Sequence, residues 1–303
     1  MGHASGLPIL VLLPVLLPVL LPVTFSTASD ANMGSDDEVT AAPAAPAEAV
    51  VPEVSDKSGY SLFNPTPRDL WRPLSADRPD FTESPITVDA GAVQVELSFI
   101  DYARDGDRNA LSVAPANLKV GLLNDVDLQF VFDPYVASDD GMSTSRGFGD
   151  LQFRLKINLW GNDGGATAFA FMPFITIPTG ADGISSDHVE GGLIFPFAMD
   201  LADSIGLGLM GETDFVYDEQ DDGYDTEFVG TGVLGLEVSN ELGLYVEGIA
   251  IASTDSDVDF RGILGAGVTY SITDDVVLDA GVNLGLVGDG DDVNIFTGIT
   301  VRF

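Results

Sequence analysis

The sequence predicts an all-β fold, a transmembrane antiparallel up-and-down β-barrel of about 12 strands. Three observations lead to this prediction. Strand-like segments recur with apolar side chains at every second position, their connections alternate between short and long, and a terminal aromatic residue completes an apolar face. In GDLQFRLKINLW, for example, apolar residues alternate with Gln, Arg, Lys and Asn. Only helices and closed barrels satisfy every backbone polar group in lipid, so such a strand would face lipid on one side and a lumen on the other.

Residues 1–28 are expected to form a secretory signal peptide. The run from 7 to 23 is apolar and uncharged, but it is shorter than the roughly 20 residues of a spanning helix and is interrupted by four prolines. Small residues follow, and Ala28 offers a cleavage site. A retained membrane anchor is the alternative.

Residues 29–78 are expected to be a disordered, acidic, Ala/Pro-rich periplasmic linker and lead-in segment. The stretch EVTAAPAAPAEAVVPEV cannot bury a core. The later part of this segment carries Arg68, Trp71, Arg72 and Arg78 among several prolines, which favour an extended chain. It could also be a tether, a partial plug or a docking strip for a partner.

Residues 79–303 are expected to form the barrel. The predicted strands cover 92–104, 110–122, 126–138, 148–160, 166–178, 189–200, 205–217, 225–238, 242–253, 258–270, 276–288 and 292–303. Connections such as LND and SNE are tight, whereas those such as TGADGISSD are longer, polar and acidic. An even number of strands places both chain ends on the short-turn side, which is periplasmic in outer-membrane barrels.

A soluble β-sandwich would also alternate, with strands of about 5 to 6 residues. The longer segments and the ending NIFTGITVRF favour the barrel, because a terminal Phe303 resembles the signal that barrel-insertion machinery recognises. The segments 166–178 and 258–270 alternate poorly, and their faces cannot be assigned.

Composition excludes several classes of function. The chain has no cysteine, which rules out disulfides and thiolate metal sites. Its net charge is −36, with only 12 Lys and Arg in 303 residues, which argues against a nucleic-acid partner.

Several stretches resemble one known family. They are ADRPDFTESPITVDAG, NLKVGLLNDVDLQF, GFGDLQFRLKINLWGNDGG, PFITIPTG and the Phe-terminated last strand, and the resemblance extends over residues 61–303. The family is that of outer-membrane transporters labelled "MetA-pathway of phenol degradation". The resemblance implies an outer-membrane barrel, nominally a transporter, and does not carry phenol over as a ligand. The chain departs from the family in its acidity and its Ala/Pro/Glu linker.

The face assignment also identifies candidate lumen-lining residues, in which acids outnumber bases and predict a preference for cations. They are Glu96, Lys119, Asp127, Gln129, Arg154, Lys156, Asn158, Glu212, Asp214, Glu227, Glu237, Glu247, Asp279 and Arg302. A 12-stranded barrel is intermediate in width between filled and open barrels, so these side chains could also pair across the lumen and occlude it.

The expected function is passage of small molecules through the outer membrane of a Gram-negative cell, with aromatic or other small organic solutes as the candidates. The expected partners are membrane lipid, the insertion machinery and the solutes, without cofactor, metal or enzymatic activity. A structural or adhesive barrel with an occluded lumen is one alternative. A lipid hydrolase using His188 beside Ser185, Ser186 and Asp187 is another. The Asp-rich loops could bind Ca²⁺ but lack EF-hand spacing.

Overall fold

A computed structural model describes residues 56–219, 222–288 and 290–303. The predicted signal peptide and nearly all of the Ala/Pro-rich linker lie outside these residues. The described part holds one short 3-10 helix, η1 (Arg68–Leu70), and 15 strands. The strands are β1 (Val93–Asp105), β2 (Arg108–Val113), β3 (Ala116–Leu123), β4 (Val126–Phe132), β5 (Tyr135–Asp139), β6 (Thr144–Gly147), β7 (Leu151–Trp160), β8 (Thr167–Ile177), β9 (Glu190–Ala202), β10 (Ile205–Asp218), β11 (Gly223–Glu237), β12 (Leu242–Ser253), β13 (Arg261–Thr273), β14 (Val276–Val287) and β15 (Val293–Arg302).

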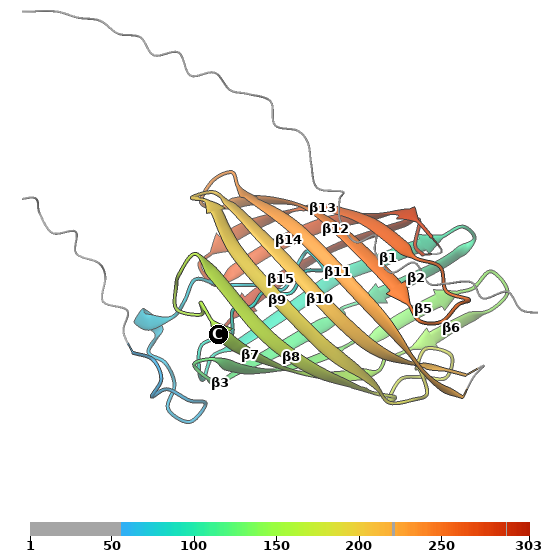
Figure 1. Cartoon of the computed structure of the whole chain (residues 1–303), viewed down its shortest axis with the longest axis horizontal. Coiled ribbons are helices and arrows are strands. Elements are labelled where there is room, and N and C mark those ends of the chain that lie inside the picture. Colours follow the sequence, from blue (N-terminus) through green and yellow to red (C-terminus); the bar gives the residue numbers. More distant parts are fainter. Residues whose placement is uncertain (1–55, 220–221, 289) are drawn as a thin grey trace, which may run out of the picture. The chain divides into compact units, whose positions relative to one another are not determined.

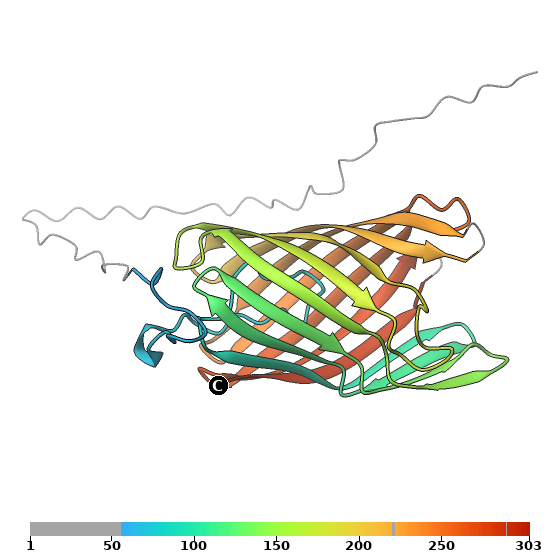
Figure 2. The same cartoon turned by 90° about the horizontal axis from the view of Figure 1, so that it is seen from below.

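The strands form one closed antiparallel barrel, which confirms the predicted fold (Figures 1 and 2). The barrel has 12 strand positions around its circumference, and we call each position a stave. The pairs β2 with β3, β4 with β5 and β6 with β7 each make one interrupted stave, because both members lie against the same neighbours. Pro115 and Pro134 stand at two of the interruptions, where a missing N–H cannot extend a ladder. Pairing between β1 and β15 closes the ring.

The two ends of the barrel differ in their connections. At the end that holds Val93 and Arg302, here called the terminal end, connections such as 124–125 and 203–204 are tight turns. At the opposite end, here called the loop end, most connections are longer, and the one between β8 and β9 covers 178–189. The first loop-end connection is an exception, with only Gly106 and Asp107. Within the described residues no helix is long and apolar enough to cross a membrane.

Burial alternates along the strands as a two-sided wall requires. On β1, Gln94, Glu96 and Ser98 are buried, whereas Val93, Val95 and Leu97 between them are partly exposed. The two poorly alternating segments now have a physical explanation. On β8 the inner face is itself apolar, because Met172 packs against Ile194, Met210 and Phe174 inside the barrel. On β13 the inner face carries glycines, which contribute no polar signal.

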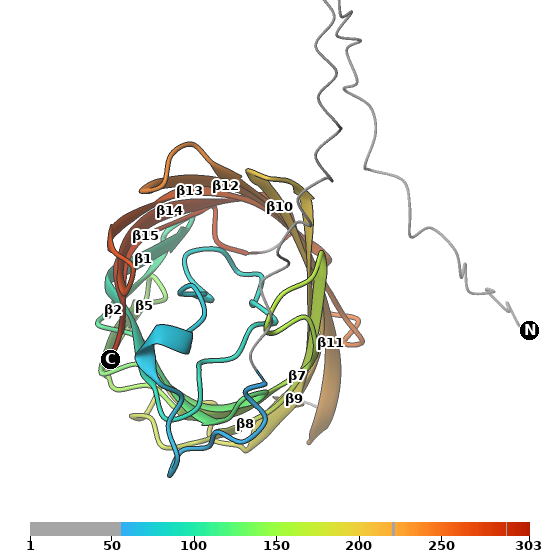
Figure 3. The same ribbon diagram turned by 90° about the vertical axis from the view of Figure 1, so that its left-hand side faces the viewer.

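The chain preceding β1 enters the barrel from the terminal end and crosses its interior (Figure 3). We call residues 56–76 the lead-in and residues 77–92 the inner segment. Lys57, Thr66 and Arg72 of the lead-in are buried, so residues 56–78 are neither a disordered linker nor a freely extended strip as expected. The reason is that charged and polar groups of the barrel interior form hydrogen bonds and ion pairs with this stretch. Its sequence alone does not reveal these partners.

Candidate functional site: the filled lumen

Ion pairs hold the inner segment against the barrel wall. Asp77 is buried between Lys119 and Lys156, and it lies 2.7 Å from the Lys156 ammonium. Arg78 forms an ion pair of 2.7 Å with Asp279 on the opposite wall. Glu83 forms an ion pair with Arg154, so the segment is anchored on several sides. Such charges tolerate burial only because each has a partner.

Inward-facing carboxylates also bind the backbone of the inner segment. Glu247 accepts hydrogen bonds of 2.8 Å from the amides of both Phe81 and Thr82. Asp127 accepts one of 3.0 Å from the amide of Val88, and Glu96 accepts one of 3.1 Å from the amide of Asp77. An irregular segment has no strand to pair with, so these carboxylates satisfy N–H groups that would otherwise be orphaned.

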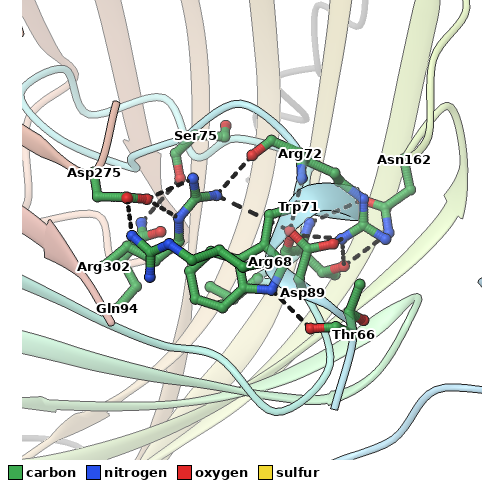
Figure 4. A network of polar contacts seen from close by, with 12 residues as sticks. Thr66, Arg68, Trp71, Arg72, Ser75, Asp89, Gln94, Asn162, Asp275 and Arg302 are labelled. Carbon is green, nitrogen blue, oxygen red and sulfur yellow. Dashed lines mark hydrogen bonds and ion pairs between the residues drawn. The ribbon is translucent and has the colours of Figure 1, made fainter. Parts of the chain in front are cut away.

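The lead-in is fixed at the terminal end by a second network around Arg72 (Figure 4). The Arg72 guanidinium donates to Asp163 at 2.9 Å and to the carbonyl oxygen of Asn124 at 2.8 Å, and its backbone N–H donates to Asp89 at 2.9 Å. Lys57 contacts both Asp89 and Asp163. Burial raises the pKa of Asp163, but hydrogen bonds from Asn124, Arg72 and Lys57 outweigh it and lower the pKa below its usual range.

Trp71 lies between two guanidinium groups at the same end. Arg68 and Arg302 stand 4.6 and 5.0 Å from its ring centre, and its indole N–H donates to the Thr66 carbonyl at 2.9 Å. Arg302 in turn donates to the carbonyl of Arg72 at 2.8 Å. The last strand is thereby joined to the lead-in.

Most of the scarce positive charge is used for this docking. Eight of the chain's 12 Lys and Arg residues form ion pairs between the barrel and the lead-in or inner segment. They are Lys57, Arg68, Arg72, Arg78, Lys119, Arg154, Lys156 and Arg302. The alternating bases of β7 therefore face the inner segment.

The structure brings most of the predicted lumen residues together around the inner segment. Those in direct contact with it or with the lead-in are Glu96, Lys119, Asp127, Arg154, Lys156, Asn158, Glu247, Asp279 and Arg302. Gln129 is buried and donates to Asp127.

Among the described residues, the remaining predicted residues form no hydrogen bond or ion pair with the inner segment or the lead-in. Glu212 and Asp214 are partly buried, Glu227 pairs with Arg261, and Glu237 is exposed at the end of β11. Sequence reasoning missed Gln94 and Ser98, although they share strand parity with Glu96. It also missed Asp77, Asp80 and Glu83, because the inner segment has no periodic pattern to reveal which side chains contact the wall.

Two cavities remain beside the inner segment. The terminal cavity, of about 390 Å³, reaches the β9–β10 turn and is lined by Leu207 and Tyr245. The loop cavity, of about 430 Å³, reaches the β14–β15 connection and is lined by Ile249 and Phe296. Both are bordered by the same three residues, Arg78, Pro79 and Asp80. These three residues of the inner segment therefore border both cavities, one of which extends toward each end of the barrel.

Glycines let the inner segment approach the wall closely. A Cβ at Gly298 of β15 would lie 2.5 Å from the Nη2 atom of Arg78, and one at Gly121 of β3 would lie 2.0 Å from the Asp89 carbonyl oxygen. A larger residue at Gly121 would displace the backbone of the inner segment, whereas one at Gly298 would displace the Arg78 side chain and would also meet the Leu97 carbonyl oxygen of β1 at 2.4 Å.

Asp80 has an unusual electrostatic position. It lies outside the strands, and burial raises its pKa well above the usual range, with repulsion from Glu247, Asp77 and Glu83 adding to the effect. Among the ion pairs of the described residues none includes Asp80. A carboxylate at the boundary of two cavities is therefore without a compensating cation.

The surroundings of His188 do not support the hydrolase alternative. Its ring stacks on Tyr217 with centroids 3.5 Å apart, and its Nδ1 atom is buried without a hydrogen-bond partner. The Ser186 hydroxyl lies within hydrogen-bond distance of two acceptors, Asp150 at 3.1 Å and the His188 backbone carbonyl at 2.9 Å, and neither is the imidazole. A nucleophilic serine activated by this histidine would have to donate its hydroxyl proton to the imidazole.

The acidic loops bring three carboxylates together at the loop end. Oxygen atoms of Asp218, Asp225 and Asp255 lie within 4.8 Å of one another. Asp225 already accepts a hydrogen bond of 2.8 Å from Thr254. Exposed acidic groups of this kind are common without an ion.

The fold and the site define a class, the outer-membrane-type β-barrel whose lumen is occupied by its own N-terminal segment. The chain belongs to the family described as "Putative MetA-pathway of phenol degradation", whose sequence profile matches residues 76–303. No curated protein matches the chain at a significant level.

Two solved structures show the same fold. An outer membrane channel from Pseudomonas putida F1 has a TM-score of 0.53 at 15% identity, covering 76% of this chain and 100% of the channel. The NanC porin has a TM-score of 0.50 at 10% identity, covering 70% of this chain and 100% of the porin. The predicted family and fold are thus confirmed.

Proposed function

We propose that this chain is an outer-membrane channel for small molecules, in which residues 78–81 of the inner segment must shift before a solute can pass. The observation that carries the proposal is that the loop cavity and the terminal cavity meet at the same three residues. Arg78, Pro79 and Asp80 therefore border a solute in either cavity. No chemical step is required.

The proposal includes an orientation and partners. The terminal end would face the periplasm, because both ends of the barrel-forming chain lie there and short turns are periplasmic in such barrels. The exposed aromatic and aliphatic outer surface would contact outer-membrane lipid. Phe303 is exposed at the strand end and would be read by the insertion machinery. The family description and the apolar part of the loop cavity are compatible with aromatic solutes.

A sealed structural barrel is the competing proposal, and it is favoured by the number of buried ion pairs that hold the inner segment. The two differ in whether the inner segment moves. The cysteine-free chain allows a direct test, because the hydroxyl oxygens of Thr82 and Thr231 are only 2.6 Å apart. A Thr82→Cys/Thr231→Cys variant should form a disulfide that ties the inner segment to β11.

The measurement is planar-bilayer conductance, with reversal potential under a salt gradient, before and after reduction of this disulfide. The single Thr82→Cys variant is the matched control. The channel proposal expects current steps with cation preference in the reduced protein and their loss on oxidation. Equal current in both states would show that no displacement is needed. Silence of the folded, reduced protein would support the sealed barrel.

A further inference from the structure

The loop cavity combines an apolar wall with acidic groups. Ile249, Ile251 and Ile263 of β12 and β13 line one side, and the ring of Phe296 lines another. Ile249 and Phe296 are almost completely buried. Apolar walls of this kind bind the carbon skeleton of a ligand, whereas a few polar groups fix its orientation.

The positive charges of the loop cavity are already neutralised. Its two basic residues are Arg78 and Arg261. Arg78 pairs with Asp279 at 2.7 Å, and Arg261 pairs with Glu227 at 2.7 Å. An anionic ligand would have to compete with these carboxylates for either guanidinium.

Three carboxylates also line the same cavity. Asp80 lines it from the inner segment, Asp101 from β1, and Asp291 is an exposed residue of the β14–β15 connection. In the described part of the chain no ion pair includes any of the three. Asp101 accepts a hydrogen bond of 2.6 Å from the Asn294 amide, which orients the carboxylate without neutralising it.

We infer that the loop cavity binds small amphipathic organic cations, with an ammonium group held by Asp80 and Asp101 and an aryl or short alkyl group against Ile249 and Phe296. The inference deepens the proposed function, because such a cation would be a solute of the channel. A neutral analogue would leave the carboxylates uncompensated, and an anion would be repelled by them. A simple inorganic cation would make no use of the apolar wall.

The pH dependence of binding follows from the same groups. Burial and the neighbouring Glu247, Asp77 and Glu83 raise the pKa of Asp80, and burial together with Asp105 and Asp292 raises that of Asp291. Both groups hold a cation only when ionised. Affinity should therefore fall as the pH decreases through these raised values.

The test is isothermal titration of the full chain, folded in detergent micelles, with four probes. Phenethylammonium carries both features, 2-phenylethanol lacks the charge, phenylacetate reverses it, and methylammonium lacks the aryl group. We expect phenethylammonium to bind about tenfold more tightly than any other probe, the ratio that one buried charge contact supplies. Equal affinity for phenethylammonium and 2-phenylethanol, or for phenethylammonium and methylammonium, would overturn the inference.

Variants assign the binding to the cavity. Asp80→Asn/Asp101→Asn should weaken phenethylammonium binding by about tenfold, because two neutral amides replace the charges. Asp291→Asn changes only an exposed rim residue and keeps the fold, and it should weaken binding by about twofold to threefold. Asp257→Asn, in the exposed β12–β13 loop outside the cavity, is the matched control. Wild-type affinity in both Asp80→Asn/Asp101→Asn and Asp291→Asn would refute the site.

Flux measurements in vesicles distinguish this inference from the proposed function. Binding of phenethylammonium without flux of any solute would leave the site intact and contradict the channel. Flux of 2-phenylethanol and phenethylammonium at equal rates, without selective binding, would leave the channel intact and contradict the site.

Discussion

Asp77→Asn should release the inner segment without unfolding the barrel. In the native protein Asp77 is buried between two lysines, and Lys156 has no other carboxylate within ion-pair distance among the described residues. Removing one partner of a buried pair costs about 3 to 5 kcal/mol. The lower value applies here, because Glu96 continues to neutralise Lys119.

A loss of about 3 kcal/mol raises the population of the released segment roughly a hundredfold, since every 1.4 kcal/mol is a factor of ten. The barrel itself should survive, because the antiparallel ladders from β1 to β15 do not involve Asp77. Two measurements can detect release of the inner segment. One is the open probability of single channels, and the other is proteolysis of the lead-in in protein reconstituted into vesicles.

The control is Glu241→Gln, an exposed acid in the β11–β12 turn that contacts Ser239 and not the inner segment. It removes the same charge and should change neither readout. If Asp77→Asn shows the open probability and protease resistance of the wild type, then the buried ion pairs do not hold the inner segment in place.

Three further predictions concern the wall and its assembly. Glu247→Gln should also raise the open probability, by less than Asp77→Asn, because the amide still accepts one of the hydrogen bonds to the inner segment; single-channel recording checks the order. Leu155→Arg, at mid-strand on the lipid face of β7, should lower the free energy of unfolding in vesicles by about 2–4 kcal/mol. Leu159→Arg, near the strand end, should lower it by at most about 1 kcal/mol. Equal losses in urea titrations would contradict the assigned membrane position. Phe303→Ala should reduce the amount of folded barrel in cells but not the yield of refolding into detergent, and unchanged assembly in cells would exclude Phe303 as the recognised signal.

The barrel was predictable because a lipid-spanning strand leaves a strong pattern. Each stave must alternate and must be long enough to cross, so the predicted ranges 205–217 and 242–253 agree closely with β10 and β12. Strand parity also identified the inward direction of residues such as Lys156 and Asp279. The faces of β8 could not be assigned because the pattern is weak there. Met172 makes the inner face of β8 as apolar as its outer face.

The partners of the inward side chains were not predictable. Lys156 and its partner Asp77 are 79 residues apart, and Asp77 lies in a segment without any periodicity. Alternation indicates which way a side chain points but not what fills the space in front of it. The partial plug was therefore only one of several interpretations of the lead-in, and the two cavities could not be anticipated.

The pairing of β1 with β15, which is the seam of the barrel, lies next to the start of the inner segment's connection to the wall. The inner segment continues into β1 through a turn in which the Ala92 amide donates to the Asp89 carbonyl, and Val93 exchanges backbone hydrogen bonds with Phe303. The residue that completes the cylinder thus meets the residue that immediately follows the inner segment. Displacement of the residues immediately before Ala92 would therefore disturb the seam, whereas a shift confined to residues 78–81 would leave the cylinder closed.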